Sequence, residues 1–201
     1  TQAFRYPLSN AELDAPMQFF AEARELGSFD DGIKNGMVSI LTSPKFLFRS
    51  EVPPEEIQPG AKFELSDLEL ASRLAFFLWS APPDSQLIAL ASQEALSQTD
   101  TLEQEINRML ADPRAEALVE NFAFQWLELR ALNEANPDGE IYPKYDPGLR
   151  DDFMQEMKLF IGSIMQEDRS VLELLSADYS YINERLALHY DIADIRGDQF
   201  R

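Results

Sequence analysis

Apolar side chains recur along this chain at intervals of three and four residues, the spacing of helices that bury one face. The strongest example is the stretch 65–80, where Ser66 precedes Glu69 by three residues in the arrangement of a capping box. Its second half is apolar almost all round, and Pro82 ends it because proline cannot donate the next helical hydrogen bond. We expect this stretch to form the central helix of the core, buried on most sides.

The same spacing predicts helices along most of the chain, and no pair of alternating segments with a hairpin turn is found. Gly27 is expected to end the first helix in the left-handed conformation, while Gly32 and Gly36 would let a neighbouring helix approach closely. The sequence therefore predicts an all-α protein, an irregular helical bundle of about eight to ten helices. The predicted helices span approximately residues 9–26, 30–41, 43–48, 66–80, 84–96, 99–111, 113–130, 146–167, 170–175 and 183–190.

Residues 51–61 interrupt this pattern. They contain Pro53, Pro54, Pro59 and Gly60 and have no helical period, which is typical of a linker. We therefore predict a small helical module at residues 1–52, a linker at 53–61 and a larger helical module at 62–201.

The charge balance is strongly acidic, with 36 acidic and 17 basic residues and a formal net charge of -19. Nucleic acids and anionic membranes both favour basic surfaces, so neither is an expected partner. No apolar run approaches the roughly 20 residues that a membrane span needs. The chain has no cysteine, which excludes disulfides, thiolate metal sites, a cysteine nucleophile and covalent c-type haem attachment in this segment. No cofactor is expected in it.

Catalytic motifs are largely missing: the sequence has no phosphate-binding glycine loop, no two-histidine zinc pattern and no Gly-x-Ser-x-Gly elbow. The one histidine, His189, lies on the predicted last helix with Asn183 and Glu184. These three residues are the catalytic candidates, with His189 as a proton shuttle or a ligand completed by another module. The alternative is that His189 holds the end of the helix through a backbone carbonyl.

A second candidate site is the loop that contains Asn136, Asp138 and Glu140. These residues are closely spaced oxygen donors of the kind that bind calcium, but the same residues are typical of a polar turn. Tyr142 and Tyr145, which follow in the loop, are expected to be exposed and could contact carbohydrate.

The remaining candidates are structural. Arg73 and Glu69 are spaced i,i+4 and could form a surface ion pair. Alternatively, Arg73 is buried and clamps carboxylates from other helices, because guanidinium binds carboxylate through two parallel hydrogen bonds. Trp79 and Trp126 could form a platform for sugars, but each lies on a predicted helix face with apolar neighbours, so we expect both in the core.

Several phrases of the sequence resemble two bacterial families of unknown function, domain families 1595 and 1592. Residues 4–9 and 41–49 resemble the small family. Residues 65–74, 77–80, 108–114, 121–123, 125–127, 183–187 and 189–190 resemble the larger one. The resemblance implies a segment of a large planctomycete-type protein that is exported to the periplasm or cell surface. Such proteins often carry a c-type cytochrome domain nearer the N-terminus, so haem would sit in another module. The implied partners are other modules of the same polypeptide or a separate protein.

These observations favour a non-catalytic structural or interaction module of an exported, cytochrome-associated protein. One alternative is part of a redox or hydrolytic enzyme whose active site is completed by neighbouring modules. The other is a carbohydrate- or calcium-binding module.

Overall fold

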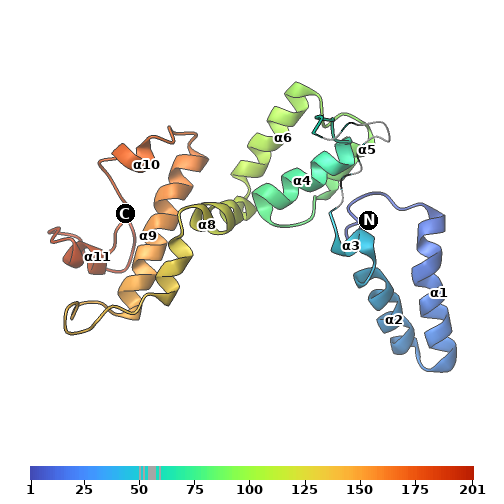
Figure 1. The fold of residues 1–201 in the computed structure, drawn as a ribbon, viewed down its shortest axis with the longest axis horizontal. Helices are drawn as coiled ribbons and strands as arrows, with labels where there is room; N and C mark the ends of the chain where they lie inside the picture. Colours follow the sequence, from blue (N-terminus) through green and yellow to red (C-terminus); the bar gives the residue numbers. More distant parts are fainter. Residues whose placement is uncertain (50, 52, 54–57, 59) are drawn as a thin grey trace. The chain divides into compact units, whose positions relative to one another are not determined.

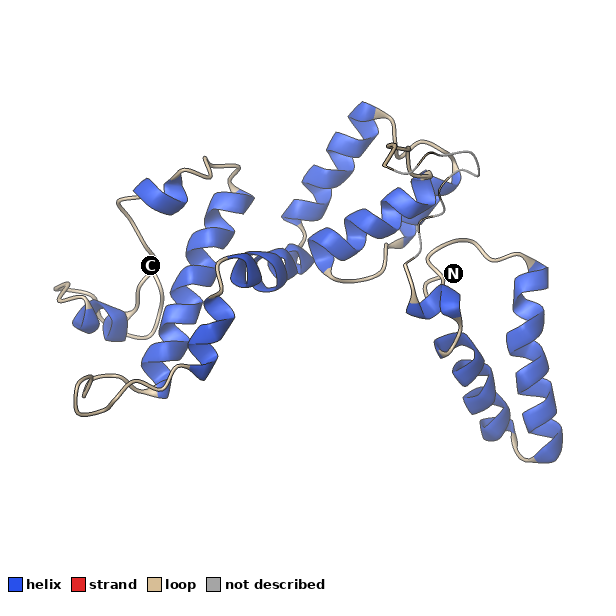
Figure 2. Cartoon of the chain, in the orientation of Figure 1, coloured by secondary structure: helices blue, strands red, loops and turns tan. Residues whose placement is uncertain are grey.

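The computed structural model describes residues 1–49, 51, 53, 58 and 60–201. Within these residues all regular elements are helical and no strand occurs, which confirms the all-α prediction (Figures 1 and 2). Of the predicted linker, residues 54–57 and 59 lie outside the described residues. No helix among the described residues is long and apolar enough to cross a membrane.

Most predicted helices are present, some of them as single turns. The α-helices are α1 (Asn10–Leu26), α2 (Phe29–Leu41), α3 (Pro44–Leu47), α4 (Asp67–Trp79), α5 (Ser85–Ser92), α6 (Thr99–Ala111), α7 (Glu116–Leu118), α8 (Phe124–Trp126), α9 (Pro147–Gln166), α10 (Glu173–Ser176) and α11 (Glu184–His189). Two 3-10 turns, η1 (Pro113–Ala115) and η3 (Leu129–Glu134), and one π-helical turn, η2 (Val119–Ala123), complete the list. The chain packs into two compact units, Thr1–Met109 and Leu110–Arg201.

Helices α1 and α2 form a hairpin whose contact is made through glycine. A Cβ atom on Gly32 would lie 2.9 Å from the carbonyl oxygen of Phe20, so only glycine fits there. A Cβ atom on Gly36 would lie 3.5 Å from the carbonyl oxygen of Pro16 and 3.6 Å from the Cβ atom of Phe20. The predicted close approach is therefore confirmed at Gly32, whereas Gly36 makes only ordinary contacts with α1.

Gly27 follows α1 as predicted, but the predicted left-handed conformation is wrong. Its φ is -145°, and a Cβ atom there would lie 2.8 Å from the carboxylate of Asp31. That carboxylate turns back to cap α2 by accepting from the backbone N–H of Ser28 at 3.0 Å. Glycine is needed at this position for space, not for a positive φ.

Helix α4 is a core helix of this unit, and five of its residues are buried. Ser66 and Glu69 form the expected capping box at its start. The carboxylate of Asp67 is buried and accepts from the backbone N–H of Leu96 at 2.7 Å, which ties the end of the next helical segment to α4. The buried apolar side chains of this unit lie mainly on α4, α5 and α6 and are Phe4, Ala71, Ala75, Leu78, Trp79, Leu87, Ile88, Ala91, Leu96 and Met109.

The predicted single helix over residues 113–130 is wrong. Its first turn is the 3-10 turn η1, and its centre is the π-helical turn η2. The π-helical turn contains one residue more per hydrogen-bonded turn than an α-helix. The segment then stops at Glu128, whose φ is 56°, before η3 begins.

Helix α9 organises the second unit and begins at the cap Asp146 with Pro147 in the first position. Two buried clusters contain its residues: Val119, Ala123, Phe124 and Ile161 form one, and Leu149, Ile182, Leu186 and Ala187 form the other. The C-terminal residue is held to this unit because Ile182 and Arg201 exchange two backbone hydrogen bonds of 3.1 Å.

Left-handed backbone occurs at several residues that are not glycine. Glu94, Glu128, Asp168 and Asp191 have φ between 50° and 56°, and each lies just after a helix or helical segment. A side chain in this conformation is strained because its Cβ atom approaches the following carbonyl oxygen.

Candidate functional site

A cavity of about 650 Å³ lies within the Thr1–Met109 unit and is lined by the N-terminal turn, by residues 45, 48, 49 and 51, and by α4. This volume is in the range of sites for small ligands. We call it the guanidinium pocket. Its aromatic lining residues are Phe4, Tyr6, Phe48, Phe76 and Phe77, and its charged lining residues are Arg5, Lys45, Arg49, Arg73, Glu51 and Glu69.

The pocket is basic in an acidic chain. Its six charged residues comprise four cations and two carboxylates, a formal charge of +2, whereas the whole chain carries -19. Cations gathered in a concave, partly apolar site raise the local concentration of anions. The four cations have different partners, and these partners decide which of them is available to a ligand.

Arg5 is a structural member of the pocket. It lies in a turn, with its φ at 64° and its backbone N–H donating to the carbonyl of Thr1. Its guanidinium donates to the backbone carbonyls of Lys45, Phe46 and Phe48 at 2.7, 3.2 and 2.9 Å. Burial and the neighbouring Arg49 charge lower the pKa of Arg5. Its donors are therefore committed to the carbonyls around α3.

Lys45 is neutralised by a carboxylate. Its Nζ lies 2.6 Å from Oε1 of Glu12, and the ring of Tyr6 lies 5.5 Å away. The ion pair with Lys45, followed by the hydroxyl of Tyr6, holds the pKa of Glu12 well below its usual range. Lys45 therefore contributes little free charge to the pocket.

Arg49 is the cation whose donors are available. Its guanidinium stacks 4.5 Å from the centre of the Phe76 ring, a distance typical of a cation–π contact. It forms no ion pair and no hydrogen bond with the residues that the structure describes. Arg5 lies over the same ring at 5.9 Å, so two positive charges share one aromatic side chain. An anion at this point would bind Arg49 and offset that repulsion.

Arg73 also lines the pocket, and this excludes its predicted role as a buried clamp. Its side chain is 64% exposed and its Nε lies 3.6 Å from Oε1 of Glu51, an exposed ion pair of little energetic weight. Glu69 is used in the capping box of α4, where it accepts from the N–H and the hydroxyl of Ser66.

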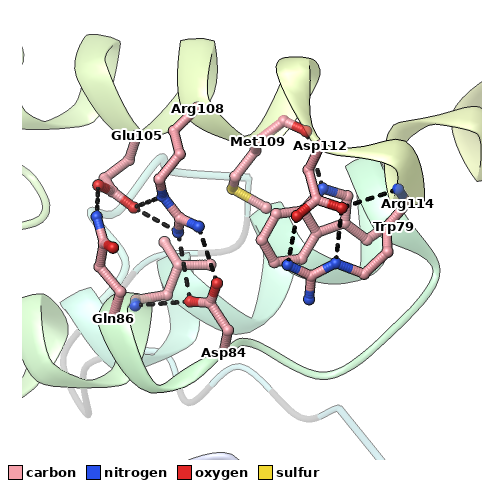
Figure 3. A network of polar contacts seen from close by, with 9 residues as sticks. Trp79, Asp84, Gln86, Glu105, Arg108, Met109, Asp112 and Arg114 are labelled. Atoms are coloured by element: carbon pink, nitrogen blue, oxygen red, sulfur yellow. Dashed lines mark hydrogen bonds and ion pairs between the residues drawn. The ribbon is translucent and has the colours of Figure 1, made fainter.

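The clamp that was predicted for Arg73 is formed by Arg108, which sequence reasoning missed (Figure 3). Its guanidinium lies 2.8 Å from Oδ2 of Asp84 and 2.6 Å from Oε2 of Glu105. Gln86 donates to the other oxygen of Glu105 at 2.5 Å. Asp84 also caps α5 through the N–H of Leu87, so the network joins α6 to the start of α5.

The two tryptophans differ. Trp79 is in the core as predicted and its indole N–H donates to the carbonyl of Met109 at 2.9 Å. Trp126 is 59% exposed, so the prediction that it packs in the core is wrong. It stacks on Phe122, one helical turn earlier, at 6.2 Å between ring centres. The π-helical turn ends at Ala123, three residues before Trp126, and rotates the following residues relative to a regular helix.

The three catalytic candidates are adjacent, but two of them have structural roles. Asn183 is buried and caps α11 by accepting from the N–H of Leu186 at 3.0 Å. Glu184 accepts from the N–H of Gly197 at 2.6 Å, which with Arg196 lowers its pKa. His189 is exposed; among the described residues its ring contacts Phe153 and Tyr190, not the backbone carbonyl proposed as an alternative.

A neighbouring carboxylate was not singled out from the sequence. Glu156 is buried on α9 and accepts from the hydroxyls of Ser180 and Tyr190 at 2.5 and 2.7 Å. Burial, followed by the hydrogen bond between Tyr190 and Glu156, raises the pKa of Tyr190. Both hydroxyl donors are neutral, so the cluster ties α9 to the chain around α11 without an ion pair.

The predicted calcium loop is folded as a turn. The carboxylate of Asp138 accepts from the N–H of Glu140 at 2.9 Å, and Asn136, Asp138 and Glu140 are exposed. No group of three potential metal-binding side chains occurs in the part of the chain that the structure describes. Tyr142 is exposed as predicted, but Tyr145 packs against the Leu149 cluster and its hydroxyl is buried, so its predicted exposure is wrong.

Most of the chain matches two known protein families. Residues 65–192 match the family described as PSD4, protein of unknown function (DUF1592). The chain belongs to the DUF1592 family. Residues 1–51, ahead of the DUF1592 region, match PSD5, protein of unknown function (DUF1595), so both families and their order agree with the resemblance noted in the sequence. Comparisons with curated proteins and with solved structures find no match. The guanidinium pocket is lined by residues from both matched regions.

Proposed function

We propose that this chain is a non-catalytic interaction module of an exported, cytochrome-associated bacterial protein, and that it binds an anionic group in the guanidinium pocket. Export and the cytochrome association rest on the resemblance to the two families. The binding function rests on one observation: Arg49 lies on the Phe76 ring with its donors unused among the described residues.

The pocket also indicates the kind of anion. Arg49 can donate two parallel hydrogen bonds to a carboxylate, a geometry that lysine cannot offer. The rings of Phe4, Phe48 and Phe76 line the same cavity and would contact a flat apolar body. The expected ligand is therefore a carboxylate attached to an aromatic or apolar group, such as an acidic segment of a partner.

Replacing Arg49 by glutamine is expected to weaken binding of such a ligand about tenfold or more, because a hydrogen bond to a charged group contributes about 1.5–3 kcal/mol. Titration calorimetry of the full chain with 2-naphthoate, at low salt, measures this. The neutral isostere 2-naphthamide is expected to bind about tenfold more weakly than 2-naphthoate to the unsubstituted chain.

Arg24→Gln is the matched control, since Arg24 is an exposed arginine of α1 outside the pocket. It should leave the affinity for 2-naphthoate unchanged. Equal affinity for the acid and the amide, or equal loss in both variants, would contradict the binding function. Turnover of a redox dye or a polysaccharide by the purified chain would contradict its non-catalytic nature.

A further inference from the structure

The hairpin of α1 and α2 exposes an apolar face. Five large apolar side chains on it have exposed fractions between 43% and 58%: Leu13, Met17, Ile33, Met37 and Leu41. Helix α1 has no buried residue at all along its length. We call these five residues the methionine face. Contiguous exposed apolar side chains of this kind mark sites of association.

The five residues lie on the same side of the hairpin, as helix geometry shows. Pro16, Gly32 and Gly36 are at the contact between the two helices. Met17, Ile33 and Met37 each follow one of these contact residues directly, so each is rotated by about 100° from the contact. The helices run in opposite directions, as Figure 1 shows, so the same sense of rotation brings both rows to one side. Leu13 and Leu41 extend the rows by one turn.

The charges around the methionine face indicate which kind of partner can bind to it. Helices α1 and α2 together carry six acidic and two basic side chains, a formal charge of -4. Two of the acidic residues, Glu12 and Asp31, have partners in ion pairs and caps, whereas Asp14, Glu25 and Asp30 are exposed. A second copy of this face, or an anionic membrane, would be repelled by these carboxylates.

We propose that the methionine face binds an amphipathic helix with an apolar seam and basic edges, supplied by a partner. Such a helix would turn the two-helix hairpin into a three-helix bundle and bury the face. Methionine adapts its flexible side chain to the shape of an apolar partner. This proposal is independent of the guanidinium pocket, because the methionine face shares no residue with the pocket lining.

The test uses the full chain and two model peptides. A fluorescein-labelled helical peptide of leucine and lysine, with leucine at positions a and d, carries the proposed chemistry, and its leucine–glutamate counterpart has the same apolar seam with the opposite charge. Fluorescence anisotropy is expected to show saturable binding of the lysine peptide and none of the glutamate peptide.

Two variants then locate the binding. Met17→Ser with Met37→Ser should weaken binding of the lysine peptide at least tenfold. Phe19→Ser with Val38→Ser removes two side chains of similar exposure from other sides of the same helices and should change it less than twofold. Equal losses in the two double variants, equal binding of both peptides, or a dimer by light scattering that Met17→Ser with Met37→Ser abolishes would overturn the proposal. Arg49→Gln should leave this binding intact.

Discussion

Replacing Arg108 by methionine is expected to lower the free energy of unfolding of the Thr1–Met109 unit by about 3–5 kcal/mol. Methionine keeps much of the apolar stem but removes the charge that Asp84 and Glu105 share. Glu105 is only 5% exposed, so its carboxylate would remain in a site of low dielectric without its cation. Hydrogen exchange of the amides of α5 and α6, measured in the full chain, reports this change.

Lys34→Met provides the control for loss of a charge. Lys34 lies 3.8 Å from Asp31 with both side chains well exposed, and such pairs contribute at most about 1 kcal/mol. Adding Glu105→Gln to the Arg108→Met variant should recover part of the lost stability, since it removes the uncompensated charge. Similar losses for Lys34→Met and Arg108→Met would show that the network is not the cause.

Replacing Gly32 by alanine is expected to destabilise the hairpin by about 1–3 kcal/mol. The new Cβ atom would meet the backbone oxygen of Phe20 at 2.9 Å, and backbone cannot move aside as a flexible side chain can. The helices would have to separate to accept it. Hydrogen exchange of the α1 and α2 amides in the full chain measures the change in opening free energy.

Gly36→Ala is the matched control on the same helix. Its Cβ atom would meet Pro16 and Phe20 at ordinary contact distances of 3.5 and 3.6 Å. Alanine also restricts the unfolded chain, so this variant is expected to gain about 0.4–1 kcal/mol. If Gly32→Ala were as stable as Gly36→Ala, close packing through Gly32 would be refuted.

Features that depend on a few neighbouring residues could be predicted from the sequence. The capping boxes at Ser9 and Ser66, and the cap Asp146 followed by Pro147, are defined within four residues and are present. The fold class follows from the repeated helical spacing, which is also local.

Features that depend on which face of a helix is covered could not be predicted. Arg73 and Arg108 both lie on amphipathic helices with acidic residues three or four positions away. Only Arg108 faces a second helix start, where Asp84 supplies another carboxylate. Trp126 fits the apolar spacing, yet the π-helical turn before it shifts its direction. A turn with one extra residue leaves no mark in the spacing of apolar residues.

The guanidinium pocket was missed for a related reason. It combines residues 4–6, residues 45, 48, 49 and 51, and residues from 68–77, which are far apart in the sequence and contain no motif in common. Arg49 has no local feature that separates it from other exposed arginines. Its distinguishing property is its position in the pocket, stacked on the Phe76 ring and without a carboxylate partner among the described residues, and this property belongs to the folded chain.

For protein engineering, the four left-handed residues that follow helical segments are positions where substitution by glycine could raise the thermal stability. Glu94, Glu128, Asp168 and Asp191 form no side-chain hydrogen bond or ion pair with any residue that the structure describes. Glycine at each position would relieve about 1 kcal/mol of backbone strain, less the entropy that glycine adds to the unfolded chain. All four replacements together would also change the net charge from -19 to -15 and lessen the repulsion that opposes a compact fold.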